Sequence, residues 1–187
     1  DEMIECLSKI GSGDVVLLHG CCHNPCGADL SREQWQQIRD VALKQGFTVF
    51  IDLAYQGLGD GLEEDVYGTR LLAETLPELI IVSSCSKNFG LYRERTGAMT
   101  LISENEAAAA VATTQIAAGA RAMYSMPPDH GAAIVQLILS DDALRSQWDT
   151  ELTETRDRIN GLRAQFVRQI QSIGIDQDFS FIEREKG

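Results

Sequence analysis

The sequence predicts an α/β fold, in which a largely parallel sheet is covered by helices on both faces. The chain contains short apolar runs bounded by turn residues, at 15–19, 47–52, 79–83 and 97–102. Helical patterns lie between the first three runs. Strands that are apolar nearly throughout, rather than alternately apolar and polar, are typical of parallel sheets buried on both faces.

The first strand and the helix after it have clear sequence boundaries. The run 15–19 leads into Asn24-Pro25-Cys26-Gly27, so a buried strand followed by a loop is expected. Ser31-Arg32-Glu33-Gln34 has the form of a capping box, which predicts a helix start there. The helix has one apolar face, and Gly46 is expected to end it.

The other elements follow in order. Between the later strands we expect a helix at 64–76, which Pro77 ends. After residue 103 the chain becomes helical. We expect helices at 104–122, 131–140 and 142–171, and a short strand at 179–182.

The composition excludes several classes of function. The chain has 187 residues, of which 44% are hydrophobic, enough to form a globular core. Its formal net charge of -12 disfavours nucleic acid and anionic membrane surfaces as partners. No apolar stretch approaches the roughly 20 residues that cross a bilayer. The acidic start, Asp1-Glu2-Met3-Ile4-Glu5, lacks the layout of a signal peptide.

The cysteines indicate reduced thiols in a cytoplasmic protein. Their odd number does not fit a disulfide framework. A zinc site is disfavoured, because adjacent cysteines fit a tetrahedral site poorly and no second ligand pair follows downstream. We therefore expect no metal. The residues considered are Cys6, Cys21, Cys22, Cys26, Cys85, His19 and His23.

Polar residues follow three of the expected strands. His23-Asn24-Pro25 comes after the first, Asp52 with Tyr55 ends the second, and Ser84-Cys85-Ser86-Lys87 follows the third. In open α/β sheets, ligands bind at the carboxyl ends of the strands. These residues are therefore expected to converge on one site.

Asp52 and Lys87 each have two interpretations. Asp52 caps a helix or joins a loop salt bridge, or else its carboxylate pairs with a cationic ring nitrogen. Lys87 is a solvated surface group, or else its amine bonds covalently to a carbonyl compound.

The motifs resemble those of the aspartate/aromatic (tyrosine) aminotransferases, the class I aminotransferases that depend on pyridoxal 5'-phosphate (PLP). Residues 84–95, Ser-Cys-Ser-Lys-Asn-Phe-Gly-Leu-Tyr-Arg-Glu-Arg, resemble the family's PLP-lysine segment. Residues 23–27 resemble its Asn-Pro turn, and residues 52–57 its pyridine-binding strand end. Residues 121–128 resemble the segment that reaches a neighbouring subunit's active site. The similarity runs through nearly the whole chain in the same order.

This resemblance implies roles for the residues at the strand ends. Lys87 would bond to the cofactor aldehyde and then act as the base in proton transfer. Asp52 would hold the pyridine nitrogen protonated and so support the electron sink. Tyr55 and Asn24 would hydrogen-bond the cofactor's ring oxygen, with Asn24 also near the substrate. The alternative for both is that they are ordinary buried polar groups.

The resemblance also implies a phosphate site and a substrate contact. Ser84, Ser86 and Arg95 would bind the phosphate, because a guanidinium matches phosphate oxygens. Arg121 would bind a substrate carboxylate across a dimer interface, or else form a surface salt bridge. Met123 and Met126 stand where relatives often have Asn, which favours an aromatic or aliphatic substrate.

The implied fold is a partial large domain of a type I PLP-dependent transferase, with a mixed, mostly parallel sheet between helices and the start of the small domain. Residues 1–140 would form the PLP-binding portion, and residues 141–187 the connecting helix and the small domain's start. The implied activity is transamination of aspartate or an aromatic L-amino acid with a 2-oxo acid such as 2-oxoglutarate, by a cytoplasmic homodimer.

The resemblance implies that the chain corresponds to only the middle of a family member. It lacks the N-terminal arm, the phosphate turn, the aromatic residue stacked on the ring and the C-terminal arginine that holds the α-carboxylate. We therefore expect weak or no turnover from it alone. The alternatives are a non-catalytic structural fragment and another PLP reaction, such as lyase chemistry, on the same fold.

Overall fold

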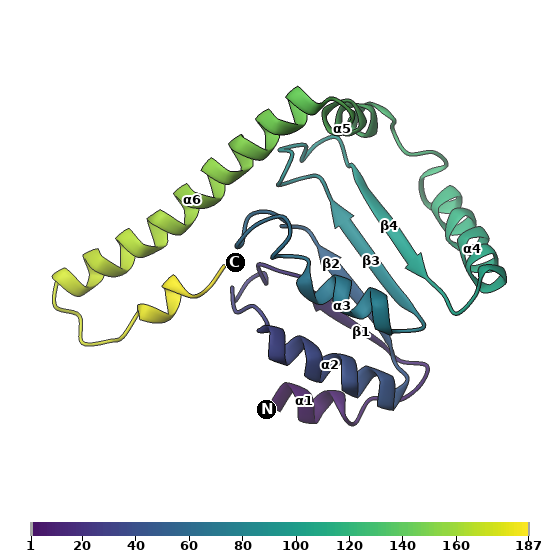
Figure 1. Ribbon diagram of the computed structural model, residues 1–187, viewed down its shortest axis with the longest axis horizontal. Helices are drawn as coiled ribbons and strands as arrows, with labels where there is room; N and C mark the ends of the chain where they lie inside the picture. Colours follow the sequence, from purple (N-terminus) through teal and green to yellow (C-terminus); the bar gives the residue numbers. More distant parts are fainter. Residues whose placement is uncertain (1, 187) are drawn as a thin grey trace.

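The computed structural model of the chain describes residues 2–186, which form a four-stranded sheet flanked by helices (Figure 1). The strands are β1 (Val15–His19), β2 (Thr48–Leu53), β3 (Leu79–Ser84) and β4 (Gly97–Ile102). The helices are α1 (Glu2–Leu7), α2 (Arg32–Gln45), α3 (Tyr67–Thr75), α4 (Glu106–Tyr124), α5 (His130–Ser140), α6 (Asp142–Ser172) and the 3-10 helix η1 (Ser180–Glu183). None of the described helices is both long and apolar enough to span a bilayer.

The sheet is mixed and mostly parallel, which confirms the expected α/β class. Its spatial order is β1-β2-β3-β4. The first three strands run parallel, whereas β4 pairs antiparallel with β3. Because α2 and α3 carry the chain back between the parallel strands, the carboxyl ends of β1, β2 and β3 meet at one edge.

One face of the sheet carries the main core. Helices α2 and α3 lie on this face, and α1 lies beside α2 (Figure 1). Ile38 of α2, Ile51 of β2 and Leu72 of α3 are each 0% exposed. Trp35 of α2 fills the space over Gly68 of α3, where any Cβ would clash with the indole. A glycine at this position therefore allows the two helices to approach closely.

The opposite face is only partly covered within residues 2–186. Helix α4 contacts β4 at the edge of the sheet (Figure 1). Val15 and Leu17 of β1, however, are 61% and 60% exposed, so the second layer of helices expected over this strand is not found in the described residues. The apolar side chains of β1 correctly predicted burial of the face that packs against the helices. The sequence of a strand does not show which segment covers its other face.

The ends of α2 confirm the local sequence signals. The Ser31 Oγ accepts a hydrogen bond from the Gln34 N–H at 3.2 Å, and the Ser31 N–H donates to Gln34 Oε1 at 2.8 Å. Gly46 ends the helix with a φ of 76°, in the left-handed region that favours glycine. Such caps satisfy backbone groups that a helix end leaves unpaired.

The structure differs from the expected elements in one boundary, one element type and one additional helix. Helix α3 begins at Tyr67 rather than at residue 64, because the Asp65 carboxylate binds the preceding loop. The expected strand at 179–182 is the 3-10 helix η1, whose start is held by a bond from the Ser180 N–H to Asp178 Oδ1 at 2.8 Å. Helix α1 was not expected, although Leu7 anchors it in the core at 5% exposure.

Helix α5 begins beside the loop that precedes β4. His130 Nδ1 lies 3.0 Å from Glu94 Oε2, and this hydrogen bond, together with the carboxylate's charge, raises the pKa of His130 above its usual value of 6.5. A raised pKa in the folded state means that the pair stabilises the protein fully at pH below the unfolded value. That stabilisation is lost as the pH rises through the folded pKa.

We therefore expect Glu94→Gln to lower the NMR titration midpoint of His130. It should also destabilise the fold at pH 5.5 and have little effect at pH 9, because His130 is then neutral in both proteins. The other two histidines in the sequence serve as internal controls. A His130 midpoint unchanged by Glu94→Gln would contradict the pairing.

Candidate active site

Four of the expected site residues, Asn24, Asp52, Tyr55 and Lys87, lie at the carboxyl edge of the parallel strands. His19, Asp52 and Val82 are paired across β1, β2 and β3. Since side chains alternate along a strand, residues in register point to the same face of the sheet. Asn24 follows β1, Tyr55 follows β2, and Lys87 follows β3. Parallel pairing therefore delivers all three loops to one place.

Asn24, Tyr55 and Lys87 are brought together there. The Asn24 side-chain amide donates a hydrogen bond to the Tyr55 hydroxyl at 3.4 Å. The Lys87 Nζ lies 4.5 Å from the centroid of the Tyr55 ring, a cation–π contact. The Asn24–Pro25 peptide is cis, and the Gly27 N–H donates to the His23 carbonyl at 2.6 Å. This turn fixes Asn24 beside the tyrosine.

Asp52 lies within β2 and is half-buried. Its backbone carbonyl accepts a hydrogen bond from the Gly20 N–H at 2.8 Å. Within residues 2–186 its carboxylate neither caps a helix nor forms an ion pair, so both structural interpretations of Asp52 are wrong for this part of the chain. A half-buried carboxylate without a cation is costly to desolvate, which makes it a suitable partner for a cationic group in the site.

The two serines and Arg95 are close along the backbone, but their side chains do not converge. The Ser86 N–H donates to the Ser84 Oγ at 3.1 Å, and Ser86 is 8% exposed. The Cys85 N–H donates to the Thr96 carbonyl at 3.0 Å, so this turn lies beside Arg95. The guanidinium of Arg95, however, donates to the Tyr92 carbonyl at 2.9 Å and is exposed.

Arg121 is separate from these residues. It lies in the last turn of α4, a helix beside β4 rather than at the ends of the parallel strands (Figure 1). Its side chain is exposed, and in the described part of the chain it forms no salt bridge. Met123 and Met126 nearby are 78% and 75% exposed. The surface around Arg121 therefore combines a free cation with exposed apolar groups.

His19 is a site residue that we did not expect from the sequence. Its Nδ1 accepts a hydrogen bond from the Asn24 N–H at 3.1 Å, and its ring stacks on His23 with centroids 4.5 Å apart. Asp29 holds the same turn, because its carboxylate accepts the N–H groups of Cys22 and His23 at 2.7 and 2.9 Å. The only available signal was the position of His19 at a strand end.

The long helix α6 also holds the lysine loop. The helix was expected, but its contact with this loop was not. The Trp148 indole N–H donates to the Asn88 carbonyl at 2.8 Å, and its ring stacks on Phe89 at 4.5 Å. The Asn88 side-chain amide donates to the Gln56 carbonyl at 3.2 Å. These contacts tie Lys87's loop both to α6 and to the loop that carries Tyr55.

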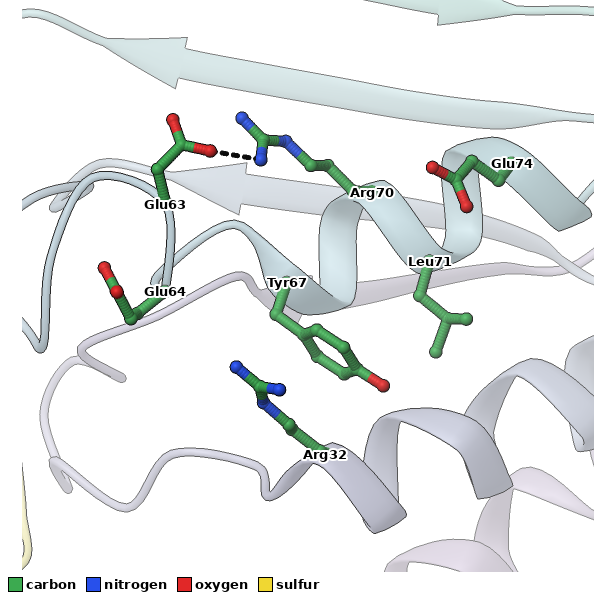
Figure 2. Close-up of a pocket in the computed structure, with 7 residues that line it drawn as sticks. All are labelled: Arg32, Glu63, Glu64, Tyr67, Arg70, Leu71 and Glu74. Carbon is green, nitrogen blue, oxygen red and sulfur yellow. Dashed lines mark hydrogen bonds and ion pairs between the residues drawn. The ribbon is translucent and has the colours of Figure 1, made fainter.

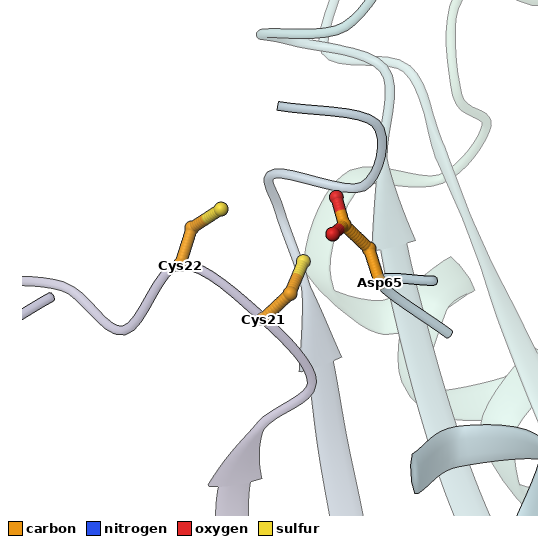
Figure 3. Close-up of side chains that lie close together, drawn as sticks. All are labelled: Cys21, Cys22 and Asp65. Carbon is orange, nitrogen blue, oxygen red and sulfur yellow. The ribbon is translucent and has the colours of Figure 1, made fainter. Parts of the chain in front are cut away.

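Asp65 lies close to the thiols of Cys21 and Cys22, and all three are buried (Figure 3). The carboxylate already accepts the backbone N–H groups of Gly57, Gly59, Asp60 and Gly61. A hydrogen bond with Cys22, and then burial, raise the pKa of the Cys21 thiol far above its usual range. A protonated thiol and a fully engaged carboxylate are poor metal ligands. We therefore assign Asp65 to holding the 56–61 loop.

A cavity of about 320 Å³ lies between α2 and α3 (Figure 2), on the helix-covered side of the sheet. The Arg32 guanidinium lies 4.6 Å from the centroid of the Tyr67 ring. Arg70 pairs with Glu63, and this hydrogen bond lowers the pKa of Glu63. Arg70 and Arg32, the two cationic groups of the lining, are thus already engaged by Glu63 and by the Tyr67 ring.

Comparison with known proteins identifies the family. Residues 1–187 match the family model for aminotransferase class I and II. The chain is 49% identical over 187 residues to the aspartate aminotransferase of Haemophilus influenzae and 44% identical over 187 residues to the aromatic-amino-acid aminotransferase of Pseudomonas aeruginosa. Each alignment covers 100% of this chain and 47% of the relative, so the chain spans about half the length of these relatives.

Solved structures give the same result. The aromatic-amino-acid aminotransferase of Burkholderia pseudomallei, covalently bound to pyridoxal phosphate, superposes with a TM-score of 0.96 at 41% identity. That alignment covers 99% of this chain and 46% of the solved one. A mitochondrial aspartate aminotransferase from Trypanosoma brucei gives a TM-score of 0.94 at 38% identity, covering 98% and 48%. The chain belongs to the class I and II aminotransferase family.

Proposed function

We propose that this chain carries the PLP-attachment site of an aminotransferase that exchanges the amino group of an aspartate or aromatic L-amino acid with a 2-oxo acid such as 2-oxoglutarate. The observation that carries the proposal is the position of the Lys87 Nζ, 4.5 Å from the Tyr55 ring centroid, at the edge where the half-buried Asp52 has no cationic partner among residues 2–186. A ligand that bonds to Lys87 and carries a positive charge toward Asp52 would use both groups.

The described residues fit the cofactor. Lys87 would hold it covalently, Asp52 would pair with its ring nitrogen, and Asn24 and Tyr55 would hydrogen-bond its ring oxygen. Ser84 and Ser86 would bind its phosphate. When bound, PLP supplies an electron sink for the pair released as the substrate Cα–H bond breaks.

The chain's own groups position the reaction and move the proton. The Lys87 amine is the base that takes the proton from the substrate Cα. The Tyr55 ring lies beside the Lys87 Nζ, and the hydrogen bond of 3.4 Å from Asn24 holds that ring, so the two residues orient the amine. The Arg95 guanidinium would leave the Tyr92 carbonyl in order to reach a phosphate.

Other features of the whole protein follow from the same proposal. We infer a cytoplasmic homodimer in which Arg121 contacts the neighbouring subunit's substrate, supported by its exposure beside Met123 and Met126. Residues 1–140 would form the cofactor-binding portion, and residues 141–187 the link to a second domain, because α6 extends beyond the sheet (Figure 1).

Reductive labelling tests the attachment site. The chain is incubated with PLP and borohydride, and the labelled residue is located by peptide mass. We expect one stable adduct on Lys87, which Lys87→Arg abolishes and Lys44→Arg leaves unchanged. Equal labelling of Lys44 and Lys87 would overturn the site. Transamination by the full-length protein yields a keto acid and no free ammonia. Release of ammonia from the amino acid would therefore overturn transamination.

A further inference from the structure

The turn after β1 contains a thiol paired with an imidazole. The Cys26 Sγ lies 3.0 Å from His23 Nδ1. The His23 ring stacks on His19 at a centroid distance of 4.5 Å and an interplanar angle of 26°, and its backbone N–H donates to Asp29 at 2.9 Å. The imidazole is therefore held in a fixed orientation, with a ring nitrogen in reach of the thiol proton.

This pair borders an apolar cavity. The cavity has a volume of about 550 Å³, and its lining includes Cys26, His23, Met3, Val16, Leu17 and Leu30. Cys26 is exposed, so that its sulfur is accessible from solvent. A small molecule with an apolar body can thus be held against the thiol.

The other thiols differ from Cys26. Cys21 and Cys22 are buried, and burial raises the pKa of Cys85. Cys6 on α1 is exposed, but no imidazole contacts it in the described part of the chain. Cys6 therefore provides a matched reference for an exposed thiol without a base.

We propose that Cys26 and His23 form a nucleophile–base pair that makes Cys26 a modification site for apolar α,β-unsaturated carbonyl compounds. In the addition, a bond forms between the Cys26 sulfur and the β-carbon of the compound, and the carbon–carbon π pair moves to the enolate. His23 Nδ1 takes the thiol proton and returns it to the α-carbon. No oxidant or leaving group is needed. This reactivity is independent of Lys87 and of any cofactor.

Limited labelling with N-ethylmaleimide tests the proposal, with sites and rates read by peptide mass. A positioned base typically contributes roughly 100-fold or more to a proton-transfer step, so we expect Cys26 to react at least about tenfold faster than Cys6. Cys26→Ser should remove the fast phase, and Cys6→Ser should preserve it. His23→Gln should slow Cys26 about tenfold without changing the rate at Cys6.

A second measurement needs no variant. The unaltered chain is labelled with N-methylmaleimide and, separately, with N-cyclohexylmaleimide. We expect the ratio of Cys26 labelling to Cys6 labelling to be higher for N-cyclohexylmaleimide, the larger apolar reagent. Equal rates at Cys26 and Cys6 would overturn the nucleophile–base pair, as would an unchanged Cys26 rate in folded His23→Gln. A ratio independent of reagent size would overturn the role of the cavity.

Discussion

Replacing Asp52 by Asn is expected to lower the turnover of the full-length protein by about 100- to 1,000-fold while most of the bound cofactor is retained. The carboxylate is half-buried, and it lacks a cationic partner among residues 2–186. It is therefore free to stabilise positive charge on a ring nitrogen. Removing a charge aimed at the reacting system typically costs about 3–4 kcal/mol of transition-state stabilisation. Cofactor attachment, which depends on Lys87, should persist.

Steady-state kcat and the absorbance of bound cofactor, measured on the same samples, separate these effects. The matched control is Asp40→Asn, because the Asp40 side chain lies on α2 and is 65% exposed. It should leave kcat within about twofold of the unaltered protein. If Asp52→Asn lost activity only in proportion to lost cofactor, Asp52 would be a binding group rather than an electrostatic one.

Replacing Asp65 by Ala is expected to destabilise the fold by about 3–5 kcal/mol. The carboxylate is 7% exposed and accepts the N–H groups of Gly57, Asp60 and two further loop residues, as described above. Each buried donor left unpaired costs about 1–3 kcal/mol, although relaxation of the loop lets some of them reach water. The free energy of unfolding of Asp65→Asn should lie between those of the unaltered protein and Asp65→Ala, because an amide keeps one acceptor oxygen.

The free energy of unfolding, measured in urea, tests this expectation. Asp157→Ala is the matched control, since the Asp157 side chain is 69% exposed and its ion pair with Arg156 spans 3.5 Å. An ion pair whose carboxylate is this exposed contributes at most about 1 kcal/mol. A change as small for Asp65→Ala as for Asp157→Ala would show that the loop does not depend on the carboxylate.

Local signals predicted the elements that depend on neighbouring residues. The capping box at Ser31 and the left-handed glycine at Gly46 bound α2 as expected, because both act within one helical turn. The start of α3 was misplaced because Asp65 binds a loop that begins eight residues earlier. Residues 179–182 are apolar enough for a strand, but a side-chain bond from Asp178 starts a 3-10 helix instead.

The site was predictable to the extent that strand ends determine it. Asn24, Tyr55 and Lys87 follow successive parallel strands, and the structure joins them. The contact between Trp148 and the Asn88 carbonyl spans 60 residues, and no local pattern indicates it. The direction of the Arg95 guanidinium depends on one backbone carbonyl and a φ of 52°, which the sequence does not encode in any recognisable motif.

The antiparallel pairing of β4 has a consequence for how the lysine segment folds. Ser84 pairs with Gly97, and a Cβ on this glycine would clash with the Ser83 carbonyl. The segment between them thus leaves and rejoins the sheet at one point. Closing so short a loop costs little entropy, and its contacts are of low sequence separation. The lysine-bearing hairpin is therefore among the least topologically demanding parts of the chain to assemble.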